Sequence, residues 1–193
     1  MLIAGLTGGL ACGKSFVAAA LQELGCFVVE ADELGHQALQ PGGAAYAPVI
    51  AEFGTTDRKR LAEIVFADPA QLARLNAIVH PAVHALAHQK FLEIGTQDPQ
   101  AIIIYAAAIL IETGVHREFP RLIVVACSGE QQFARAMRRP GATEADVRAR
   151  LARQLPLQQK RELADFLIDS SGTPADTLRQ TKIVFEELRK LPQ

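Results

Sequence analysis

Residues 8–15 of the chain read Gly8-Gly9-Leu10-Ala11-Cys12-Gly13-Lys14-Ser15. This segment fits the pattern G-x-x-x-x-G-K-[ST], and it lies between an apolar run, Leu2–Leu6, and an amphipathic helical pattern, Lys14–Leu24. Glycines allow successive backbone N–H groups to curve around an anion, and the start of a helix adds unpaired amides and a positive dipole end. Lys14 supplies a mobile charge for the β- and γ-phosphates of a nucleotide, and Ser15 supplies a hydroxyl for Mg²⁺. The segment therefore predicts a nucleotide-binding P-loop.

Short apolar runs alternate with helical patterns along the rest of the chain, which is typical of an α/β fold with a parallel sheet. Continuous apolar runs suit strands that are covered on both faces. The runs are Leu2–Leu6, Phe27–Glu30, Ala101–Tyr105, Leu122–Cys127 and Phe166–Ile168. We predict a three-layer α/β/α P-loop NTPase core with a five-stranded parallel sheet. The long, mostly helical stretch between the second and third strands, about 35–95, predicts a subdomain instead of a simple crossover.

Local signals predict where several helices begin and end. Asp68-Pro69 and Thr173-Pro174 each read as an N-cap followed by the first helical residue. His80-Pro81 predicts a break, with a new helix that runs to Gly95. Cys12 stands beside the start of a helix, a position that lowers the pKa of a thiol.

Composition excludes several classes of protein. Apolar residues make up 49% of the 193 residues and charged residues 21%, which is ordinary for a globular protein, and the net charge of −1 gives no reason to expect a nucleic-acid or membrane partner. The longest apolar run, Ala101–Ile111, is too short to span a bilayer, and the first residues do not resemble a signal peptide. Three widely spaced cysteines indicate a reducing compartment. We expect a cytoplasmic protein that is a monomer or a small homo-oligomer.

The P-loop alone does not separate a kinase from a switch GTPase. The chain has no Asn-Lys-x-Asp for guanine, and its Asp169–Gly172 segment, which fits D-x-x-G, follows the last strand instead of the third. Residues 135–161 favour a kinase, since eight basic residues against two acids give them a local net charge of +6. The basic residues are Arg135, Arg138, Arg139, Arg148, Arg150, Arg153, Lys160 and Arg161, and the acids are Glu144 and Asp146. Arginines on a closing lid stabilise charge on a transferred phosphoryl group. The alternative is a solvated basic helix face.

Asp32 is the candidate general base. It follows the strand-like run Phe27–Glu30, so it lies at the carboxyl edge of the sheet, where ligands bind in open α/β folds. We expect this second strand to neighbour the P-loop strand, which would let Asp32 accept a hydroxyl proton near the γ-phosphate. The alternative is that Asp32 caps a helix starting at Glu33.

Six segments together resemble the dephospho-CoA kinase family, in its order and spacing over nearly the whole chain. They are Gly5–Ser15, Glu30–Asp32, Asp57-Arg58, Leu75–Pro81, Ile109–Gly114 and Ala164–Gly172. The resemblance implies ATP-dependent, Mg²⁺-assisted phosphorylation of the ribose 3′-hydroxyl of dephospho-CoA, the last step of coenzyme A synthesis. It also implies a core of 1–34, 96–134 and 162–193, a CoA-binding subdomain of about 35–95, and a lid of about 135–161.

By the same resemblance, the nucleotide contacts run from Gly8 through Ser15 to Phe16, with Ser15 at the metal. Lys14, Asp32 and Arg139 are the catalytic residues, and Asp32, Arg58 and His80 line the acceptor. One departure stands out, because Ala106 occupies the position at which the family carries an acid. Two alternatives therefore stay open: a kinase of another nucleotide-like acceptor, and a nucleotide-binding protein with weakened catalysis.

Overall fold

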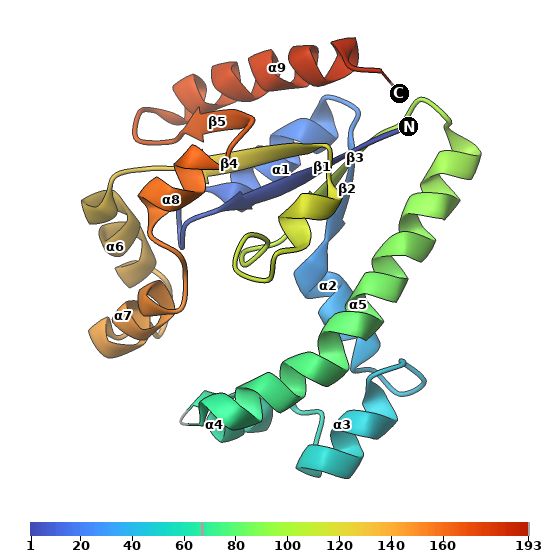
Figure 1. Cartoon of the computed structure of the whole chain (residues 1–193). Coiled ribbons are helices and arrows are strands. Elements are labelled where there is room, and N and C mark those ends of the chain that lie inside the picture. The colour runs from blue at the N-terminus through green and yellow to red at the C-terminus, as the bar shows by residue number, and fades with distance from the viewer. Residues whose placement is uncertain (67, 193) are drawn as a thin grey trace. The chain divides into compact units, whose positions relative to one another are not determined.

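The computed structural model describes residues 1–66 and 68–192, and Figure 1 traces them by residue number. The chain forms two compact units. The first consists of Met1–Val29 with Ile94–Gln193, and the second of Glu30–Glu93. Among the described residues, no helix combines the length and the apolar character needed to cross a membrane.

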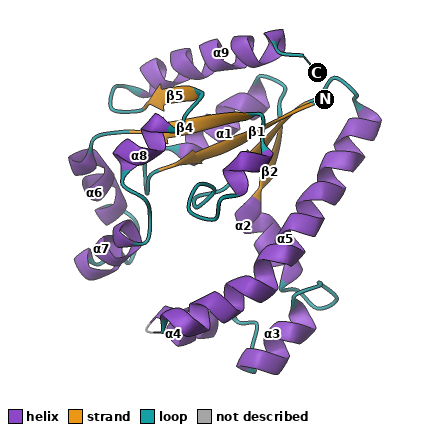
Figure 2. Ribbon diagram, in the orientation of Figure 1, coloured by secondary structure: helices purple, strands orange, loops and turns teal. Residues whose placement is uncertain are grey.

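A five-stranded parallel sheet forms the centre of the first unit (Figure 2). Its strands are β1 (Leu2–Gly8), β2 (Phe27–Glu30), β3 (Ile102–Ala106), β4 (Arg121–Ala126) and β5 (Phe166–Asp169). The order across the sheet is β2-β3-β1-β4-β5, with Leu6 of β1 opposite Ala106 of β3 and Ile123 of β4. The predicted fold class is confirmed.

The second strand does not neighbour the P-loop strand, so that expectation was wrong. β3 lies between β2 and β1. Burial gives the physical reason: all five residues of β3 are buried, as a central strand requires, whereas Phe27 of β2 is 37% exposed. A strand with an exposed residue is suited to the edge of a sheet, where one side lacks a neighbouring strand.

Helices cover both faces of the sheet. Helices α1 (Lys14–Glu23) and α9 (Pro174–Lys190) pack on one face, where Val17, Leu21, Val184 and Leu188 share a core with alternate residues of the strands. The opposite face lies under the segment that follows β3, which includes the 3-10 helix η1 (Val115–Glu118). The remaining helices of this unit are α6 (Gly129–Met137), α7 (Glu144–Ala152) and α8 (Leu157–Glu162). The start of α9 at Thr173-Pro174 is confirmed, because Thr173 caps it.

The second unit is helical, with its own small core. It contains α2 (Ala31–Ala38), α3 (Tyr46–Phe53), α4 (Arg58–Phe66) and most of α5 (Pro69–Gln97). The predicted start of α5 is confirmed, since Asp68 Oδ1 accepts from the backbone N–H of Ala70 at 2.8 Å. Val49, Leu61 and Ala82 belong to the core that these helices enclose.

The predicted break at Pro81 is wrong, because α5 continues through it to Gln97. Proline removes one backbone donor, which destabilises a helix interior but does not by itself end the helix. Apolar residues on both sides of Pro81, including Ile78, Ala82 and Leu86, pack into the same core. We infer that this packing outweighs the local cost of the proline.

Candidate active site

The P-loop links the end of β1 at Gly8 to the start of α1 at Lys14. Two glycines are required by geometry: Gly13 has φ 93°, and a Cβ on Gly8 would meet the carbonyl oxygen of Val125 at 2.5 Å. Ala11 adopts φ 59°, a left-handed conformation that costs an L-residue roughly 1–2 kcal/mol. The loop thus turns sharply into the helix, as anion binding at a helix N-terminus requires.

The loop that follows β5 contacts the backbone of the P-loop and helps to hold it in place. Ser170 Oγ donates to the carbonyl oxygen of Cys12 at 2.6 Å, and Arg135 Nη2 donates to the carbonyl oxygen of Ser170 at 2.8 Å. The Asp169–Gly172 segment, which resembles a switch motif in sequence, therefore contacts P-loop backbone. Nothing in the sequence pattern alone indicates these contacts.

The thiol of Cys12 is buried, so the predicted lowering of its pKa is wrong. Its Sγ lies 2.9 Å from the Sγ of Cys127, and both cysteines are free. Burial, followed by the hydrogen bond to Cys127, raises the pKa of Cys12 to about 12. The side chain points into the apolar core instead of toward the helix N-terminus, so Cys12 contributes its backbone and not a reactive thiolate to the loop.

Six of the eight basic residues of segment 135–161 fall into two groups, which the sequence did not separate. Four of them make structural contacts: Arg135 with Ser170, Arg148 with Glu144, Lys160 with Glu112, and Arg161 with Asp169. Lys160 is fully buried, with its Nζ 2.7 Å from Glu112 Oε1, so it is not a lid cation. Arg139 and Arg150 instead line a cavity of about 170 Å³ together with Leu10 of the P-loop.

The residues expected at the acceptor, Asp32, Arg58 and His80, all belong to the helical unit. Asp32 is exposed in the first turn of α2, whose N-cap is Glu30, so Asp32 is not the cap of a helix starting at Glu33. Arg58 begins α4 and is exposed. His80 lies on α5, and partial burial lowers its pKa, which favours the neutral imidazole.

Ala106 is the last residue of β3 and is fully buried beside β1. Its backbone pairs with Leu6, two residues before the strand ends at Gly8 and the P-loop begins. A carboxylate side chain would be costly at such a position unless a cation or hydrogen bonds compensated its charge.

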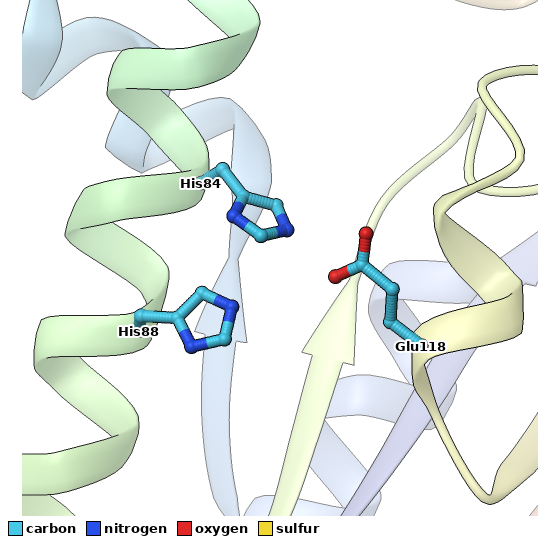
Figure 3. Close-up of side chains that lie close together, drawn as sticks. All are labelled: His84, His88 and Glu118. Carbon is cyan, nitrogen blue, oxygen red and sulfur yellow. The ribbon is translucent and has the colours of Figure 1, made fainter.

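Two histidines form a ring contact on α5. His84 and His88 lie one turn apart, with ring centroids separated by 4.6 Å (Figure 3). Among the described residues of the helical unit, no third metal-ligating side chain joins the pair, and zinc sites normally take three or four protein ligands. We assign the pair no role in the candidate active site.

Comparisons with known proteins extend over almost the entire chain. Residues 2–176 match the family model described as CoaE, dephospho-CoA kinase. A dephospho-CoA kinase of Geobacter metallireducens is 38% identical over 97% of this chain and 96% of its own, and one of Thermobifida fusca is 39% identical over 98% of each. The crystal structure of TT1252 from Thermus thermophilus superposes with a TM-score of 0.82 at 31% identity, covering 96% of this chain and 97% of that one.

Proposed function

The chain belongs to the dephospho-CoA kinase family, and from this premise we propose how its residues transfer the γ-phosphoryl group of ATP to the ribose 3′-hydroxyl of dephospho-CoA. The observation that carries the proposal is the complete P-loop between β1 and α1, in a chain whose relatives are named for this reaction. The P-loop backbone and the N-terminus of α1 bind the phosphates of ATP. Lys14, the first residue of α1, pairs with the β- and γ-phosphates.

Asp32 accepts the proton of the acceptor hydroxyl. Two observations support this role for Asp32. A carboxylate can accept a proton, and Asp32 lies directly after β2, in the first turn of α2, where its carboxylate is exposed and close to the carboxyl end of a strand. Arg58 offers charge for the phosphates of dephospho-CoA, and a neutral His80 offers a hydrogen bond to the acceptor.

The oxygen donors near the P-loop fit Mg²⁺, which prefers oxygen ligands and retains several waters. Ser15 is exposed in the first turn of α1, directly after Lys14, so its hydroxyl is available as one ligand beside the phosphates of ATP. Bound Mg²⁺ would neutralise charge on the β- and γ-phosphate oxygens. Position 106 is an alanine, so no carboxylate at this strand end can help to hold Mg²⁺. This favours the second candidate function, a nucleotide-binding protein with weakened catalysis.

One assay tests the proposal. Purified protein is incubated with ATP, Mg²⁺ and dephospho-CoA, and ADP and coenzyme A are quantified, with nucleoside monophosphates as competing acceptors. Formation of coenzyme A in step with ADP is expected. ADP formed only with another acceptor would assign a different substrate, and ATP binding without transfer would favour the second candidate function.

The compartment and assembly are also part of the proposal. All three cysteines are free and buried, which suits the reducing conditions of the cytoplasm. We expect a monomer or a small homo-oligomer, which light scattering on the same preparation distinguishes.

Replacing Ala106 with aspartate should lower the Mg²⁺ requirement. A carboxylate at this strand end would hold water molecules of the Mg²⁺ shell, and loss of such outer ligands elsewhere weakens metal sites roughly 10–100-fold. We expect Ala106→Asp to reduce the Mg²⁺ concentration for half-maximal activity by about 10-fold or more and to raise kcat. A Mg²⁺ titration at saturating ATP measures both.

Ala106→Asn is the matched control, because asparagine has the same shape without the charge. It should leave the Mg²⁺ requirement near that of the wild type. An unchanged requirement in Ala106→Asp, together with a lower melting temperature, would show that the new carboxylate is simply a buried charge.

Removing the Arg139 guanidinium should mainly slow phosphoryl transfer. Arg139 lines the cavity beside Leu10, and charge on the phosphoryl oxygens develops as the transfer proceeds. We expect Arg139→Ala to lower kcat by about 10- to 100-fold, the size of one charge-assisted hydrogen bond. Steady-state kinetics at saturating substrates measures this. Arg138→Ala, an adjacent exposed arginine, should retain nearly full activity, and equal losses in the two variants would contradict a specific role for Arg139.

A further inference from the structure

Gln154 connects the P-loop to the segment that follows α7. Its side-chain Oε1 accepts a hydrogen bond from the backbone N–H of Leu10 at 2.9 Å, across 144 positions of sequence. Its Nε2 lies 3.5 Å from the carbonyl oxygen of Ala108, a longer and weaker contact. Because Leu10 is inside the P-loop, Gln154 directly holds one amide of the loop that binds the phosphates.

The backbone that carries Gln154 is itself held in place by a buried ion pair. Glu112 Oε1 accepts from the backbone N–H of Leu155 at 2.9 Å and from Lys160 Nζ at 2.7 Å. Lys160 also donates to the carbonyl oxygen of Ala108 at 3.2 Å, which in turn accepts from Thr7 Oγ1 at 3.3 Å. The Lys160 side chain is 0% exposed and that of Glu112 is 14% exposed. Segment 154–160 is thereby fixed to the segment that follows β3, which Thr7 of β1 also contacts through Ala108.

The P-loop residue next to Leu10 needs such support. Ala11 has φ 59°, and strained backbone of this kind persists only where surrounding contacts determine it. The N–H of Cys12 donates to the carbonyl oxygen of Gly9 at 3.1 Å, which closes a tight turn with Leu10 and Ala11 at its centre. The Gln154 contact to the Leu10 amide holds this turn from outside the loop.

We propose that Gln154 is a positioning residue of the P-loop: by holding the Leu10 amide, it keeps the loop in its phosphate-binding conformation before ATP arrives. The inference rests on the proposed function only in taking ATP as the ligand of the P-loop. Gln154 acts through backbone and does not touch the reacting atoms. A loop that is ordered in advance loses less conformational freedom on binding, so the contact strengthens ATP binding. The contact stabilises the ATP-bound ground state and the transition state equally. Its loss should therefore change KM and leave kcat nearly constant.

The test compares Gln154→Leu with Gln158→Leu. Gln158 is an exposed residue of the same segment that bonds Glu162 at 3.3 Å, so it controls for the chemical change itself. Calorimetric titration with Mg²⁺-ATP gives Kd, steady-state kinetics gives KM and kcat, and thermal unfolding without ligand gives the melting temperature. We expect Gln154→Leu to raise both Kd and KM for ATP by about 3- to 10-fold, the effect of one neutral hydrogen bond, with kcat within about 2-fold. Gln158→Leu should match the wild type.

A lower melting temperature with unchanged ATP affinity would assign Gln154 a purely structural role and overturn the inference. Gln154→Asn serves if the leucine variant fails to fold, because it keeps an amide but withdraws the acceptor by one methylene; wild-type ATP affinity in this variant would also overturn the inference. Failure of the proposed function gives a different result, namely no coenzyme A from the wild type. In that case the calorimetric comparison of Gln154→Leu with Gln158→Leu still decides the role of Gln154.

Discussion

Lys14→Ala is expected to lower kcat/KM for ATP by at least about 10³-fold while leaving the fold intact. Lys14 is the only basic side chain within residues 8–15, so no neighbouring cation in the P-loop can replace it at the β- and γ-phosphates. The same cation stabilises the charge that spreads over the transferred phosphoryl group, so both ATP binding and transfer should suffer. Initial rates over a range of ATP concentrations measure the loss.

Stability should respond differently from activity. Lys14 is the first residue of α1, where a positive charge is unfavourable beside the positive end of the helix dipole. Alanine removes that charge and has a high helix propensity, so the melting temperature should stay within about 2 °C of the wild type. Lys182→Ala, an exposed lysine on α9, is the matched control and should keep full activity. Near wild-type turnover in Lys14→Ala would contradict the P-loop assignment.

The parts of the fold that the sequence predicted correctly depend on local signals. The P-loop glycines, the strand before them and the helix after them are neighbours in sequence, and each residue type has a local physical reason to be there. The capped helix starts at Asp68 and Thr173 belong to the same class, because the capping side chain lies within three residues of the amides that it accepts from.

The parts that sequence reasoning missed depend on contacts between distant residues. Pro81 predicts a helix break on local grounds, and packing on both of its sides prevents the break. The sequence alone predicts that Lys160 is a lid cation, because its ion-pair partner is not apparent there. That partner is Glu112, 48 residues earlier in the chain. The position of Cys12 beside a helix start predicts a lowered thiol pKa, but burial in the core and the contact with Cys127 raise it instead.

The candidate site residues also divide into those that a local motif predicts and those that depend on contacts between distant residues. Lys14 and Ser15 could be identified from one motif. Gln154 could not, since a glutamine after a helix carries no signal until the fold brings it to Leu10. The order of β2 and β3 was also beyond local signals, because it depends on which strand is buried at the centre of the folded sheet and which lies at its edge.

Asp32→Asn is expected to lower kcat by about 10²- to 10⁴-fold, the usual contribution of a general base, with little change in the Kd for ATP. Asparagine has nearly the same shape but cannot accept the acceptor's proton, so the loss should appear in the chemical step. Single-turnover measurements with ATP and dephospho-CoA isolate that step, and calorimetry gives the ATP affinity.

Glu33→Gln is the control that separates this chemistry from helix stability. Asp32 and Glu33 are adjacent exposed acids in the first turn of α2, and each should stabilise the helix through its dipole by about 0.3–1 kcal/mol. Both substitutions should therefore lower the melting temperature by a similar few degrees, about 1–4 °C. If Asp32 is the base, only Asp32→Asn also loses phosphoryl transfer. Similar small losses of activity in both variants, or an Asp32→Asn protein that binds ATP poorly yet keeps its kcat, would assign Asp32 to helix structure or nucleotide binding and leave the base to another residue.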